Sequence, residues 1–106
     1  MKTIHHACLL LGFAVFAPGC RGPTEAERDN RRVLDAILTA ITLKNPRLLE
    51  DDARRARTRY EAGQLNDEEY RAMEAIVAKA RAGDWSGAET DGYAFRKQHP
   101  FVKEGQ

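Results

Sequence analysis

The sequence predicts an all-α fold, a small bundle of about four short helices arranged as two helical hairpins. After residue 24, apolar residues recur every three or four positions, which is the spacing of one helix face. Between these apolar segments lie the N-capping residues, prolines and glycines that begin and end helices. No stretch alternates apolar and polar residues with the period of two that a half-buried strand requires.

The first hairpin is predicted to begin at Thr24, which with Glu27 has the pattern of a capping box. The apolar stripe that follows consists of Val33, Leu34, Ile37, Leu38 and Ile41. Asn45-Pro46 ends this helix and begins the next, because Asn is a good N-cap and Pro suits the first helical position. The stripe of the second helix consists of Leu49, Ala53, Ala56 and Tyr60.

The turn between the hairpins is predicted at Gly63, a glycine expected to end the second helix in the left-handed conformation. Leu65 is expected to fill the corner, and Asn66 with Glu69 repeats the capping-box pattern. The third stripe consists of Tyr70, Met73, Ile76, Val77 and Ala80. It leads to Gly83, which ends the third helix.

A fourth, shorter helix is predicted from Trp85 to Gln98, with Asp84 as its N-cap. Gly87 and Gly92 lie inside it, and we expect each to weaken it by up to ~1 kcal/mol relative to Ala. Two aromatic residues of this helix, Trp85 and Phe95, are expected to close it onto the third.

The apolar run of residues 7–17 is about half as long as the ~20 residues that a transmembrane helix needs. It fits the core of a secretory signal peptide. The segment Ala17-Pro18-Gly19-Cys20 resembles the lipobox of bacterial lipoproteins, although Ala stands where Leu is commoner. The resemblance implies diacylation of the Cys20 thiol and removal of residues 1–19. Ordinary secretion with cleavage after Ala17, or an uncleaved anchor, are the alternatives.

This resemblance divides the chain into a signal peptide (1–19), a lipidated tether (20–23), a helical domain (24–101) and a flexible tail (102–106). It places the protein in the bacterial cell envelope, attached to the membrane by its N-terminal lipid. Arg21 rather than Asp follows the cysteine, which favours the outer membrane over the inner one. Loss of Lys2 leaves 16 basic residues of the original 17 against 16 acidic ones. A nearly neutral domain argues against nucleic-acid binding.

Two further segments resemble known helical modules. Residues 60–70, Tyr-Glu-Ala-Gly-Gln-Leu-Asn-Asp-Glu-Glu-Tyr, are similar to the core of SHOCT-type segments. Residues 83–88, with Pro100 further on, resemble the second half of a tetratricopeptide repeat, although Gly92 and Phe95 depart from its pattern. The first resemblance implies tethering or oligomerisation, and the second a helix-turn-helix unit.

The leading hypothesis for function is therefore a small helical interaction or structural module that presents a hairpin surface to a protein partner. The candidate partner surface contains Tyr93 and Phe101, because aromatic residues are enriched at interface hot spots. The alternative is an envelope binder of anionic ligands such as lipid phosphates or cell-wall groups. Its candidate ligand-binding residues are Arg54, Arg55, Arg57 and Arg59.

A simpler interpretation of these arginines is a solvated helix face with i,i+4 ion pairs. The pairs expected from the spacing are Glu50–Arg54, Asp51–Arg55 and Arg57–Glu61.

The sequence predicts no enzyme, no cofactor and no metal site. After processing, His99 is the one remaining histidine, and no Ser or Cys motif marks a nucleophile for it. A histidine near a helix C-terminus interacts favourably with the helix dipole when protonated, which is its expected role. One His without a free Cys lacks the ligands of a closed zinc site.

Overall fold

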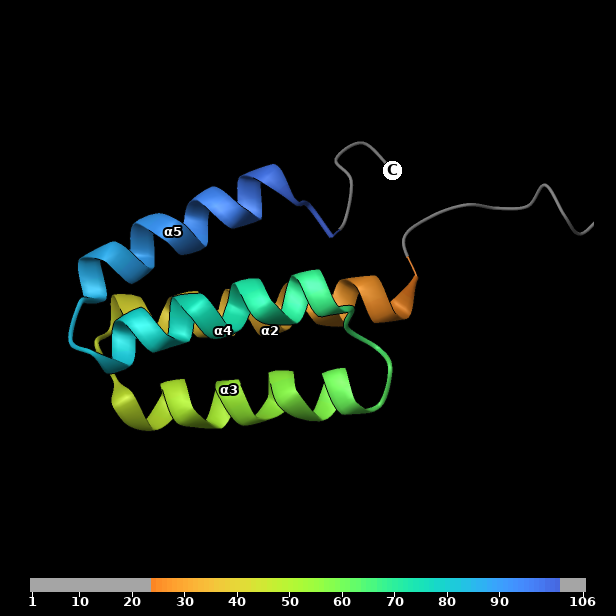
Figure 1. Cartoon of the computed structure of the whole chain (residues 1–106), viewed down its shortest axis with the longest axis horizontal. Helices are drawn as coiled ribbons and strands as arrows, with labels where there is room; N and C mark the ends of the chain where they lie inside the picture. The colour runs from red at the N-terminus through yellow and green to blue at the C-terminus, as the bar shows by residue number, and fades with distance from the viewer. Residues whose placement is uncertain (1–23, 102–106) are drawn as a thin grey trace, which may run out of the picture.

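The computed structural model describes residues 24–101, which form four α-helices and contain no strand. These helices are α2 (Glu25–Thr42), α3 (Pro46–Glu61), α4 (Asp67–Arg81) and α5 (Trp85–Gln98). Successive helices run in opposite directions, as the colour gradient of Figure 1 shows. The predicted all-α fold is confirmed. The predictions for residues 1–23 and 102–106 lie outside the described residues.

The four helices close on one another. α2 contacts each of the other three helices, α4 packs against α3 and α5, and α3 and α5 do not touch. The largest fully buried side chains come from α2, α3 and α4: Leu34, Ile37, Ile41, Leu49, Met73 and Val77. Half-buried aromatic residues surround this core: Tyr60, Tyr70, Trp85 and Phe95. The predicted stripes therefore face a common core, and Trp85 and Phe95 pack against it as expected.

Each of the three connections between helices contains one residue with positive φ. Gly63 (φ 78°) and Gly83 (φ 91°) occupy this position after α3 and α4, and Lys44 (φ 51°) occupies it after α2. The following amide then donates to a carbonyl of the last helical turn, the hydrogen bond of a Schellman motif. These bonds are Asn45 N to Ala40 O (2.9 Å), Gln64 N to Arg59 O (2.9 Å) and Asp84 N to Lys79 O (3.0 Å). The prediction for Gly63 is confirmed, whereas Lys44 was not anticipated.

Helix starts also follow the sequence. Thr24 and Asn66 each accept from the backbone amide three residues on, and Glu27 and Glu69 accept from the capping residues' own amides, so both predicted capping boxes are present. Leu65 is buried in the corner between α3 and α4.

Gly92 is buried where α5 packs against α2, and a Cβ placed on it would overlap Leu38 Cδ2 unless that side chain shifted. Its lack of a side chain therefore favours the close approach of the two helices, a role that the sequence did not indicate.

Candidate functional site

The arginine-rich part of α3 is paired differently from the expectation. Arg54 pairs with Asp51, and the nearest Arg55 and Asp52 atoms are 3.6 Å apart, both at i,i+3 spacing. The predicted i,i+4 partners of these arginines, Glu50 and Asp51, are therefore wrong. The short Asp side chains reach the arginines one turn away, and Glu50 is drawn to another helix.

Glu50 forms a bidentate ion pair with Arg81 of α4. Arg81 Nε and Nη2 donate to the two carboxylate oxygens at 2.7 and 2.8 Å. These hydrogen bonds lower the pKa of Glu50 and raise that of Arg81. Arg54, Arg57 and Arg81 line a depression of about 120 Å³ between α3 and α4, together with Glu50 and Glu74. Carboxylates thus face the guanidinium groups of this depression.

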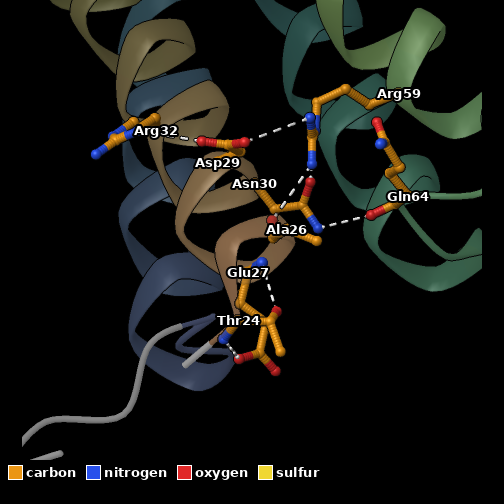
Figure 2. Close-up of polar contacts among 8 residues, drawn as sticks. All are labelled: Thr24, Ala26, Glu27, Asp29, Asn30, Arg32, Arg59 and Gln64. Carbon is orange, nitrogen blue, oxygen red and sulfur yellow. Dashed lines mark hydrogen bonds and ion pairs between the residues drawn. The ribbon is translucent and has the colours of Figure 1, made fainter. Parts of the chain in front are cut away.

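Arg59 connects the C-terminal end of α3 to the N-terminal end of α2 (Figure 2). Its Nε donates to Asn30 Oδ1 at 2.7 Å, and its Nη2 donates to the carbonyl of Ala26 at 3.3 Å. Asn30, which is 4% exposed, donates in turn to the carbonyl of Gln64 at 2.9 Å. Only 15% of the Arg59 side chain is exposed. The arrangement makes Arg59 a structural link between two helices and leaves little of it for a ligand.

The aromatic residues at the C-terminal end divide into one exposed and one buried residue. Tyr93 is 46% exposed, as a partner surface requires. Phe101 is 6% exposed, so its expected place on that surface is wrong. Its ring meets those of Phe95 and His99 edge-on, at centroid distances of 6.1 and 5.0 Å. After α5 ends, the chain folds this ring into the apolar core.

His99 has partners that the sequence did not indicate. Its ring stacks on Phe95, and its Nε2 lies 3.0 Å from Glu69 Oε2 at the start of α4. The sequence gives no sign of this contact, because the two residues are 30 positions apart.

Sequence reasoning also missed two exposed leucines. Leu43 is 61% exposed and Leu48 is 39% exposed, in the α2–α3 connection and the first turn of α3. We call the end of the bundle that holds the connections 43–45 and 82–84 the turn end; it is opposite to Thr24 (Figure 1). A depression of about 360 Å³ lies there, lined by Trp85 and Lys44 among others. The only signal in the sequence is that Leu43 falls outside the apolar stripe of its helix.

A second surface depression, of about 510 Å³, lies between α2 and α5, and we call it the α2–α5 groove. Its lining residues are Arg31, Tyr93, Arg96, Lys97 and Pro100. The sequence indicates Tyr93 as a surface residue but none of these three basic residues, because they come from two separate helices.

No helix between residues 24 and 101 is both long and apolar enough to cross a membrane. In the same range, no group of three or more His, Cys, Asp or Glu side chains is placed to hold a metal ion. Cys20, the predicted lipidation site, lies outside the described residues. Comparison of the chain with protein-family models, curated proteins and solved structures finds no match.

Proposed function

We propose that this protein is a lipid-anchored component of the bacterial cell envelope, and that its helical bundle is an interaction module for a protein partner. The observation that carries the proposal is the position of Leu43 and Leu48. These two leucines are exposed at the turn end, opposite to the end of the bundle at which the chain from Cys20 enters. Two of the three large apolar side chains that are exposed within residues 24–101 thus lie at this one end, and exposed apolar surface that is grouped rather than scattered is typical of protein–protein contacts.

The anchoring part of the proposal is supported by chain length. Thr24, the N-cap of α2, is four residues after Cys20, and four residues span at most ~14 Å. An acylated Cys20 would therefore hold the Thr24 end of the bundle close to the bilayer. α2 has 18 residues and so measures about 27 Å at 1.5 Å per residue. The turn end can then face away from the membrane. Arg21 favours the outer membrane as its location.

Anchoring is tested with Cys20→Ser. In a bacterial host, the native chain should incorporate labelled fatty acid and lose residues 1–19, as intact mass would report. The Ser variant should carry no label, and it should either leave the membrane fraction or remain unprocessed. A Ser variant that is still labelled and membrane-bound would contradict the lipobox interpretation.

Partner binding is tested by site-specific photocrosslinking in cells. A photoreactive residue at Leu43 should capture a discrete partner, whereas the same residue at Thr58, exposed on α3, should not. The double variant Leu43→Ser, Leu48→Ser should lose the captured species and keep the native melting temperature. Equal capture from Leu43 and Thr58 would contradict the proposal that the turn end is the partner surface. A probe at Tyr93 tests the surface predicted from the sequence in the same experiment.

A further inference from the structure

The α2–α5 groove combines positive charge with one exposed aromatic ring. Arg31, Arg96 and Lys97 line it, and Tyr93 is 46% exposed beside them. The nearest carboxylate is that of Asp35, which lies 3.6 Å from Arg31 Nε and 3.3 Å from Arg96 Nη1.

Asp35 does not provide hydrogen bonds for all of the basic groups around it. Within residues 24–101, Arg31 Nε and Asp35 Oδ1 are both buried and have no hydrogen-bond partner. Lys97 forms no ion pair with any carboxylate in the same range. Arg31 and Arg96 therefore share one carboxylate and Lys97 has none within residues 24–101, whereas Arg81 in the α3–α4 depression has a carboxylate of its own in Glu50. Positive charge is in local excess at this groove, although the protein as a whole is nearly neutral.

The groove lies in the half of the bundle nearer to Thr24. Arg31 belongs to the first half of α2, and Arg96 and Lys97 belong to the last turn of α5. Because α5 runs antiparallel to α2, its C-terminal end lies beside the N-terminal part of α2 (Figure 1). If Cys20 is acylated, the groove is held within reach of the lipid headgroups.

We propose that the α2–α5 groove binds the phosphate of an anionic phospholipid in the membrane to which the chain is attached. A guanidinium group presents paired donors that match phosphate oxygens, and Lys97 adds a flexible point charge. Tyr93 suits the membrane–water interface, because its ring is apolar and its hydroxyl is polar. This inference rests on the proposed anchoring, and it assigns the bundle a preferred orientation in which the groove faces the bilayer.

The test measures how closely a tryptophan placed in the groove approaches the lipid headgroups. Trp85 is the chain's only tryptophan and lies near the turn end. In the full chain, the double variant Trp85→Phe, Tyr93→Trp moves the probe into the groove. The purified protein is added to vesicles of phosphatidylcholine alone, or of phosphatidylcholine with phosphatidylglycerol, each containing a nitroxide-headgroup lipid. Quenching at position 93 should be at least threefold stronger in the anionic vesicles, and native Trp85 should show no such difference.

Charge variants in the probe background identify the groups responsible. Arg96→Gln with Lys97→Gln should weaken the binding constant for anionic vesicles, obtained from quenching against lipid concentration, by roughly 10- to 30-fold, because one basic residue near an anionic surface contributes roughly fivefold. Arg47→Gln with Arg55→Gln removes the same charge from the exposed surface of α3 and should leave the preference nearly unchanged. An equal loss in both pairs would mean that total charge, and not the groove, attracts the membrane.

Two further results would overturn the inference. Equal quenching in the two kinds of vesicle would show that the groove does not recognise anionic lipid. Loss of quenching in 10 mM inorganic phosphate, with ionic strength held constant by chloride, would assign the groove to a soluble phosphate instead. Acylation is read from the intact mass of the same preparation. A chain without acyl groups that still prefers anionic vesicles would therefore contradict the lipid anchor and support lipid binding by the groove. An acylated chain without that preference would support the anchor and contradict lipid binding by the groove.

Discussion

The hydrogen bonds between Asn30 and Arg59 lead to a quantitative prediction. Asn30→Ala removes the acceptor of the 2.7 Å bond from Arg59 and the donor of the 2.9 Å bond to Gln64. Asn30 is 4% exposed, so in the variant water has little access to the groups that these hydrogen bonds leave without a partner. A hydrogen bond to a charged group contributes about 1.5–3 kcal/mol and a neutral one about 0.5–1.5 kcal/mol. The free energy of unfolding should therefore fall by about 2–4 kcal/mol.

Arg59→Ala should cost a similar amount, because it leaves the Asn30 oxygen without its donor and removes the bond to the Ala26 carbonyl. Arg54 provides a matched control, since its side chain is 68% exposed and its ion pair with the exposed Asp51 lies within one helix. Arg54→Ala should cost no more than ~1 kcal/mol, which is usual for an exposed pair.

Urea unfolding of the full chain at pH 7, followed by circular dichroism, measures all of these variants. The double variant Asn30→Ala, Arg59→Ala should be less destabilised than the sum of the single variants, by about 1–2 kcal/mol of coupling. If Asn30→Ala and Arg59→Ala each cost no more than Arg54→Ala, or if their effects simply add, then Arg59 is not a structural link. Arg59 would then again be a candidate for binding an anionic ligand.

Four other predictions concern single positions. Gly63→Val should destabilise the fold by about 1–2 kcal/mol because L-residues are strained at φ 78°, and Lys44→Gly should raise the melting temperature because it relieves strain at φ 51°; opposite or absent shifts in thermal melts would contradict both. Burial raises the pKa of Asp52, against the opposing effect of Arg55, so the folded state holds this proton more tightly than the unfolded state and loses stability as pH rises through the folded pKa. Asp52→Asn should accordingly match or exceed native stability at pH 7 and lose that advantage near pH 3, and a variant that is less stable at pH 7 would refute this. Phe101→Ala should lower the free energy of unfolding by about 3 kcal/mol, as buried aromatic residues do; an unchanged urea midpoint would return this ring to the partner surface.

The parts of the fold that the sequence predicts correctly are set by interactions within a few residues. Thr24 with Glu27 and Asn66 with Glu69 are three positions apart, so their capping boxes depend on local geometry alone. Lys44 escaped prediction for a physical reason that is also local. Asn45 is already the extended N-cap of α3, with φ −108° and ψ 100°, so the left-handed position must fall on the residue before it.

The features of the site that the sequence does not predict depend on which helix faces which. Arg59 and Asn30 are 29 positions apart, and Asn30 and Gln64 are 34 apart. Helical periodicity shows that these residues lie on particular faces, but it does not say which helix packs against each face. Phe101 illustrates the same limit, because a residue beyond the last helix becomes buried only when the assembled core offers a place for its ring.

The positions of the acidic residues decide where positive charge is available on this protein. α3 has the highest density of arginines, yet Arg54 and Arg55 face aspartates one turn away and Arg59 is directed into the α2–α3 contact. The α2–α5 groove receives fewer basic residues, but they come from two helices that supply only Asp35 as a shared counter-charge. The dense run of arginine in α3 is therefore neutralised in part by aspartates of the same helix, although Arg47 and Arg57 form no ion pair within residues 24–101. The proposed groove differs because its basic side chains come from two helices and converge beside a single carboxylate.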